Sequence, residues 1–188
     1  MKLNKLTLYS FLMLIFAAAI YRVLPKPEGL YGFAPQIAMA IFGGSVIKDK
    51  KLAFALPLLS MFISDVLFEI LYISGLNNIP GFYNGQLINY VLFGLLTVVG
   101  FFINRKNILH IGLGSVAAPV LYFLTSNFLV WLNGGGWYRP KTAEGLFMCY
   151  ADGLPFLKGS LAGTLFFAIL LFGGYYLIKK PENQVKTA

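Results

Sequence analysis

Two carboxylates inside an apolar stretch are the residues of this sequence most able to do chemistry. Asp65 and Glu69 are four positions apart, so on a helix they lie on one face. The residues around them, 52–73, are long and apolar enough to cross a membrane as a helix. A charge at such a depth is costly unless it pairs with another group or lines a cavity. The pattern therefore indicates either a buried ion pair or a polar ligand site.

Other hydrogen-bonding side chains gather towards the same end of the neighbouring apolar segments. The first segment ends near Arg22, whose depth makes it the expected ion-pair partner of Asp65. The other segments contribute Gln36, Asn89, Asn127 and Trp131. Two interpretations stay open: these groups join helices by hydrogen bonds, or they line one pocket that opens to the outer side. The second explains why the groups share one side of the membrane.

The sequence lacks the residues that most enzymes need. It contains one His and one Cys and has no HExxH or CxxC spacing, so neither a metal site nor a disulfide is expected. His110 and Ser115 lie near the opposite, inner end without a GxSxG motif, which argues against serine hydrolysis. No P-loop is present, so the chain cannot hydrolyse nucleotide itself. We expect a protein that is not an enzyme and that holds no cofactor.

The composition predicts an all-α membrane protein. The 188 residues are 58% hydrophobic and 12% charged, and the mean hydropathy is +0.73, which leaves too little polar surface for a water-soluble protein of this size. We expect residues 1–188 to form a single integral membrane domain of six transmembrane helices. The expected ranges are 6–24, 35–47, 52–73, 86–103, 108–132 and 160–178. The second is short for a hydrocarbon layer of ~30 Å and must extend, thin the bilayer or be shielded by its neighbours.

The basic residues predict how these helices are oriented. With the N-terminus inside, ten of the 15 Lys and Arg residues fall in cytoplasmic segments and five fall outside. This is the bias of the positive-inside rule, so we expect both termini in the cytoplasm. A cleaved signal peptide ending at Ala17-Ala18-Ala19 is the alternative for the N-terminus. Nucleic-acid binding is not expected, because the basic clusters have no interleaved aromatic residues.

The outer segment between the fifth and sixth helices is too long for a simple turn. Within residues 133–159, apolar side chains recur at helical spacing after Pro140, so we predict a separate interfacial helix in this loop. Tyr138 and Arg139 precede it. The segment is either a lid over the outer pocket or an aromatic belt at the membrane surface.

Several short stretches carry a family resemblance that covers most of the chain. They are the run from Phe33 to Gly44, Pro57-Leu58, Ser64-Asp65, the run from Asn127 to Trp131, the run from Trp137 to Pro140, Cys149-Tyr150 and Leu154-Pro155-Phe156. Together they resemble an uncharacterised bacterial inner-membrane family of unknown function. That family is in turn similar, in size, six helices and cytoplasmic termini, to the substrate-binding S components of energy-coupling factor transporters of vitamins and metals.

The resemblance implies a multi-pass protein of the bacterial inner membrane that works with a scaffold membrane subunit and ATPases. It implies a small-molecule site near the outer face, covered by loops. S components commonly carry Ala-x-x-x-Ala on the first helix for the scaffold, whereas this chain has Leu14 and Ala18. An orphan binding protein or a facilitator therefore stays open.

We interpret the chain as a membrane-embedded binding subunit for uptake of a small nutrient, either vitamin-like or a metal. The expected partners are this substrate and membrane lipid. The residues expected to contact the substrate are Gln36, Asp65, Glu69, Asn89, Asn127, Trp131, Tyr138 and Arg139. Two alternatives stay open: an ion- or proton-coupled carrier or channel in which Asp65 and Glu69 relay the ion, and a structural subunit of a larger membrane complex.

Overall fold

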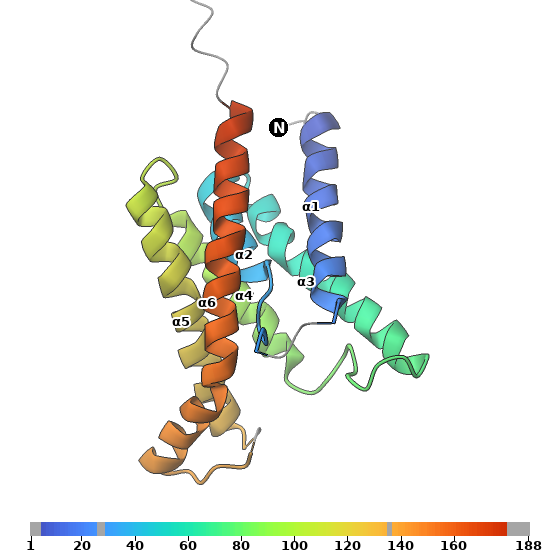
Figure 1. The fold of residues 1–188 in the computed structure, drawn as a ribbon, viewed down its shortest axis with the longest axis vertical. Coiled ribbons are helices and arrows are strands. Elements are labelled where there is room, and N and C mark those ends of the chain that lie inside the picture. Colours follow the sequence, from blue (N-terminus) through green and yellow to red (C-terminus); the bar gives the residue numbers. More distant parts are fainter. Residues whose placement is uncertain (1–4, 26–28, 135–136, 180–188) are drawn as a thin grey trace, which may run out of the picture.

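The computed structural model describes residues 5–25, 29–134 and 137–179, and these contain helices and connecting segments but no strand (Figure 1). The helices are α1 (Lys5–Val23), α2 (Gln36–Val46), α3 (Lys50–Ile73), α4 (Gln86–Phe101), α5 (Ile108–Leu132) and α6 (Ala143–Lys179). The all-helical prediction is confirmed for this part of the chain. Figure 1 shows the start of α1 and the end of α6 at the same end of the molecule.

Local sequence signals fix where several helices begin. The Asp49 side chain caps α3 by accepting hydrogen bonds from the backbone N–H groups of Lys51 and Leu52. Asn107 caps α5 in the same way through the N–H of Leu109, at 2.9 Å. Short polar side chains at these positions satisfy N–H groups that have no partner within the helix. Both caps lie just before the apolar stretches, so these helices start close to where the hydropathy predicts.

Three helices, α3, α5 and α6, are long and apolar enough to cross a membrane. The prediction that six helices do so is not confirmed. With 11 and 16 residues, α2 and α4 rise about 17 and about 24 Å, and the apolar part of α1 with described side chains is Leu8–Val23. The second and fourth helices were predicted as 35–47 and 86–103, so the structure makes both slightly shorter.

The short helix α2 lies in the middle of the molecule. It contacts α3, α4, α5 and α6, and all of its residues from Gln36 to Ile41 are buried. The non-helical segment before it packs on α6, where Gly159 and Gly163 leave room for the backbone of residues 31–34. Irregular backbone at membrane depth is tolerated where protein covers it. Its neighbours therefore shield α2, which explains why a helix too short to span the bilayer can stand here.

Between α5 and α6, the described residues 133–134 and 137–142 contain no separate interfacial helix, which corrects that prediction. Residues 143–159 instead form the first part of α6, a helix of 37 residues, and Figure 1 shows these first turns bent away from the long remainder. Pro155 lies inside the helix. A proline costs one intrahelical hydrogen bond and bends a helix without ending it when the freed carbonyl can be solvated. Ala151, which carries that carbonyl, is exposed.

The surface of the helices is strongly apolar. Ile108 is 87% exposed, Phe102 81%, Leu87 80% and Leu177 77%, and water-soluble monomers rarely expose apolar side chains on this scale. The buried side chains form clusters around α2 and leave the outer faces of the other helices apolar. This distribution suits a protein surrounded by lipid.

The crossing of α2 and α4 is closely packed and depends on two glycines. A Cβ at Gly100 would lie 2.6 Å from the carbonyl oxygen of Ile41, and one at Gly44 would lie 2.8 Å from the Cα of Gly100. Both distances are shorter than side chains accept, so the absence of side chains sets how near the two backbones come.

We predict that Gly100→Ala lowers the melting temperature of the purified protein in detergent, because the added methyl group forces α2 and α4 apart at a cost of about 1–3 kcal/mol. Gly94→Ala on the same helix is the matched control. A Cβ there would meet only the Phe54 ring, at 3.9 Å, so its melting temperature should equal or exceed that of the wild type. Equal melting temperatures for the two variants would contradict the close crossing.

Candidate functional site

The carboxylate of Asp65 is the centre of a buried polar network. Asp65 is 1% exposed, forms an ion pair with Arg22 of α1, and accepts hydrogen bonds from Gln86 Nε2 and, at 2.6 Å, from Tyr90 Oη of α4. The Arg22 guanidinium also donates to Ser64 Oγ. The ion pair expected between Arg22 and Asp65 is therefore present. Together these contacts connect α1, α3 and α4 through one carboxylate.

Glu69 holds the segment between α3 and α4 against α3. Its Oε2 accepts hydrogen bonds from the backbone N–H groups of Gly81, at 2.9 Å, and Phe82, at 3.1 Å. Gln86 Nε2 donates to the Gly81 carbonyl at 2.9 Å. Any side chain at Gly81 would overlap the Asp65 carbonyl oxygen, so only glycine lets this segment come so close. Asp65 and Glu69, which were both expected to contact a substrate, thus bind other groups of the protein. Neither residue lines the cavity described next.

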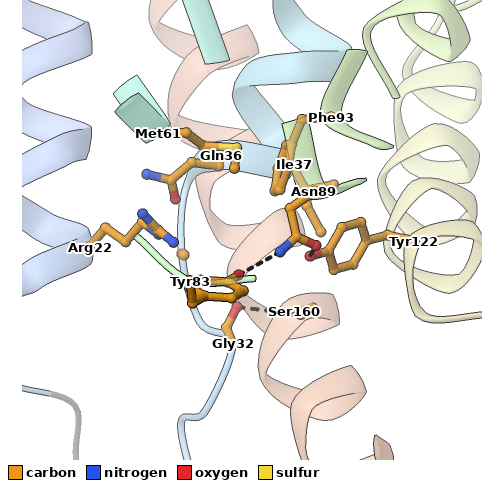
Figure 2. A pocket seen from close by; sticks show the side chains of 11 residues that line it. Arg22, Gly32, Gln36, Ile37, Met61, Tyr83, Asn89, Phe93, Tyr122 and Ser160 are labelled. Atoms are coloured by element: carbon orange, nitrogen blue, oxygen red, sulfur yellow. Dashed lines mark hydrogen bonds between the residues drawn. The ribbon is translucent and has the colours of Figure 1, made fainter. Parts of the chain in front are cut away.

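A cavity of about 180 Å³ lies beside this network. All six helices contribute to its wall (Figure 2). Its lining consists of Arg22, Gly32, Ala34, Gln36, Ile37, Met61, Tyr83, Asn89, Phe93, Tyr122 and Ser160. Ile37, Met61 and Phe93 make an apolar side, whereas Gln36 and Asn89 are the two expected contact residues that the structure brings to this wall.

Asn89 organises two tyrosines on one side of the cavity. Its Nδ2 donates to Tyr83 Oη at 2.6 Å, and its Oδ1 accepts from Tyr122 Oη at 3.0 Å. Figure 2 shows the three side chains in a row along the wall. Both ends of the amide are engaged, so Asn89 fixes the positions of the two rings.

Among the residues that line the cavity, Gln36 has incomplete hydrogen bonds; Thr164 Oγ1, away from the cavity, is the other buried side-chain atom without a partner in the described ranges. Gln36 is 2% exposed, and its Nε2 donates to the Ala18 carbonyl at 3.3 Å and to Ser60 Oγ at 3.4 Å. A carbonyl can only accept, so the nitrogen of the amide faces Ala18. The other end, Oε1, is buried and has no hydrogen-bond partner among the described residues. Leaving such an acceptor unpaired costs about 1–3 kcal/mol.

The remaining expected contact residues form a separate cluster where α5 meets α6. Asn127 Nδ2 donates to the Phe123 carbonyl at 2.8 Å, and Trp131 Nε1 donates to the Pro140 carbonyl at 2.8 Å. Arg139 forms a two-pronged ion pair with Asp152, at 2.9 and 3.0 Å. This cluster fastens the 137–142 segment to the helices, and none of these side chains lines the cavity.

The charges and exposure in this cluster agree with a role at the surface. The side chains of Arg139 and Asp152 are each 29% exposed. Tyr138, the remaining expected contact residue, is 83% exposed with a positive φ of 51°. Neither the lid nor the aromatic-belt interpretation is tested by these contacts, but Tyr138 does not close the cavity in this structure.

The sequence interpretation missed several wall residues. Tyr83 belongs to a connecting segment, and its place depends on how Glu69 folds that segment back. Ser160 stands at the start of an apolar stretch, whereas Tyr122 lies just before the polar run Thr125-Ser126-Asn127. One signal was available for Tyr122: it lies near the same end of α5 as Asn127, about one turn further into the helix.

The match of one protein family covers nearly the whole chain. Residues 2–186 match the family described as "Family of unknown function (DUF6580)", so the chain belongs to this family. The expected membership of an uncharacterised family is thereby confirmed. No curated protein and no solved structure matches the chain.

We predict that Asp65→Ala destabilises the protein by about 3 kcal/mol, because it removes a carboxylate with a 2% exposed side chain that pairs with Arg22 and accepts hydrogen bonds from Gln86 and Tyr90. Adding Arg22→Met to Asp65→Ala should recover part of the loss, and the melting temperatures of the single and double variants in detergent measure this coupling. Asp152→Ala is the control, since it breaks an ion pair that is nearer the surface and should lower the melting temperature much less. A wild-type melting temperature for Asp65→Ala would show that the network does not hold the helices.

Proposed function

We propose that this member of the family is a membrane-embedded binding subunit for the uptake of a small organic molecule, comparable to the S component of an energy-coupling factor transporter. The observation that carries the proposal is the cavity. Each of the six helices contributes at least one residue to its wall, and one of these residues, Gln36, has a buried Oε1 without a partner among the described residues. A purely structural bundle gains nothing from such an acceptor, whereas a ligand can satisfy it.

The proposal favours an organic ligand over a metal ion. No group of three or more His, Cys, Asp or Glu residues able to hold a metal occurs in the described ranges. The cavity wall itself contains none of these residue types, and hard or borderline metal ions need such ligands. Of the two nutrient classes expected from the sequence, the vitamin-like one is therefore the one we propose.

The proposal also assigns an orientation and partners. We place the protein in the bacterial inner membrane with both termini in the cytoplasm, so that the cavity opens to the outer side. The positive-inside charge bias and the position of the start of α1 and the end of α6 at one end of the molecule support this. Because the sequence has no P-loop, energy for uptake would come from a scaffold membrane subunit with ATPases.

A coupled ion carrier has less support. Such a carrier would use Asp65 and Glu69 as relay groups that gain and lose a proton or ion. The Asp65 carboxylate is occupied by Arg22, Gln86 and Tyr90, and Glu69 holds backbone N–H groups. Releasing either group would loosen the contacts that form the outer half of the molecule, so we assign both a positioning role.

We predict that at least one member of a panel of B-group vitamins and nucleobases raises the melting temperature of the wild-type protein by several degrees at saturating concentration. Ala34→Phe, which fills the cavity, should abolish the shift. Ala162→Phe is the matched control, because residue 162 is exposed on α6, and it should keep the shift. The proposal fails if no panel member acts, or if the shift survives in Ala34→Phe. A shift with divalent metal ions alone would replace the organic ligand by a metal.

A further inference from the structure

The charges around the cavity leave no net charge for a ligand to balance. Arg22 is the one ionisable side chain of Lys, Arg, His, Asp or Glu type in the lining. Its guanidinium is already paired with Asp65, which does not line the cavity. An anion at Arg22 would approach the Asp65 carboxylate, and a cation would meet the Arg22 charge. A charged ligand of either sign would lose its water without gaining a free counter-charge, and burying an unpaired charge is costly in free energy.

The hydrogen-bonding groups that remain are complementary to an amide. Gln36 Oε1 requires a donor, because no described residue supplies one. On the opposite side, the Tyr83 hydroxyl accepts from Asn89 Nδ2 and still has its own hydrogen to donate. Figure 2 shows the Gln36 amide, the Arg22 guanidinium and the Tyr83 ring around the same space. A ligand that satisfies this wall presents an N–H donor to Gln36 and an acceptor to Arg22 or Tyr83.

The volume of the cavity accommodates about one ring. The cavity measures about 180 Å³, and an apolar cavity of roughly 150 Å³ holds benzene. One six-membered ring with a small polar substituent therefore fills the space. Ile37, Met61 and Phe93 supply the apolar and aromatic surface against which the faces of such a ring can pack.

We propose that the cavity is selective for a neutral single-ring molecule with an adjacent N–H donor and carbonyl acceptor, that is, an aromatic amide or a lactam. This inference rests on the proposed function and names the substrate class of the same site. Gln36 is its specificity-determining residue, because Gln36 Oε1 is the acceptor that an apolar ring leaves unpaired.

Four compounds of matched size test this on the purified full chain in detergent. Benzamide is the neutral amide, benzoate the anion, benzamidine the cation and toluene the apolar ring. The expected result is that benzamide raises the melting temperature most and binds at least about tenfold more tightly than the other three, which corresponds to one satisfied buried hydrogen bond.

Two variants locate the effect at Gln36. Gln36→Leu should weaken the binding of benzamide by at least about tenfold, so that its affinity falls to that of toluene. Ser115→Ala is the control, because Ser115 is buried, donates to the Ile111 carbonyl of its own helix and does not line the cavity. Its benzamide affinity should stay within about twofold of the wild type.

Each result separates this inference from the proposed function. Tighter binding of benzoate or benzamidine than of benzamide overturns the neutral class and leaves a small-molecule site in place. Equal binding of toluene and benzamide, or unchanged benzamide affinity in Gln36→Leu, overturns the role of Gln36. If none of the four compounds binds, the substrate class is wrong, and the vitamin and nucleobase panel then decides the proposed function by itself. The compound series needs only the wild-type protein, so a failure of Gln36→Leu to fold does not remove the test.

Discussion

A carboxylate buried in an apolar helix must be paired with partners, and the contacts of Asp65 hold α1, α3 and α4 together. Arg22 brings α1 to α3, and Tyr90 and Gln86 bring α4. Since these partners come from two other helices, α1 and α4, the free energy of pairing one charge also fixes the relative positions of three helices. The 74–85 segment is drawn in by the same set of contacts, because Gln86 also donates to the Gly81 carbonyl.

The cavity follows from this arrangement. With its charge matched by Asp65, Arg22 forms one side of the wall without giving it a net charge. The buried α2 places Gln36 opposite, and the segment held by Glu69 brings Tyr83 into line with Asn89. The carboxylates of Asp65 and Glu69 therefore hold helices and a connecting segment in place. The residue that lines the cavity beside them, Gln36, carries an uncharged amide. This division explains why the site suits a neutral ligand although charged residues stand close by.

The sequence predicted the parts of the fold that depend on local signals. The bounds of α5 agree with the prediction because Asn107 caps the helix just before the apolar run, and the Arg22–Asp65 pair was expected from depth alone. The prediction of a separate interfacial helix was wrong because the helix that begins at Ala143 continues through Pro155 to Lys179, and the residue whose carbonyl Pro155 cannot bond, Ala151, is exposed. The wall residues Tyr83, Tyr122 and Ser160 depend on helix rotation and on the folded path of a connecting segment, and no local pattern encodes these.

The central claim is that the six helices enclose a solvent-accessible cavity that opens to the outer face of the membrane. Its most direct measurement is the labelling of Ser160→Cys, on the cavity wall, by a membrane-impermeant thiol reagent added to spheroplasts. Cys149→Ser removes the native thiol, and Lys50→Cys at the start of α3 serves as the cytoplasmic comparison. The account predicts that Ser160→Cys reacts in intact spheroplasts and Lys50→Cys reacts only after lysis. Labelling of Lys50→Cys in intact spheroplasts, with Ser160→Cys protected until lysis, would contradict it.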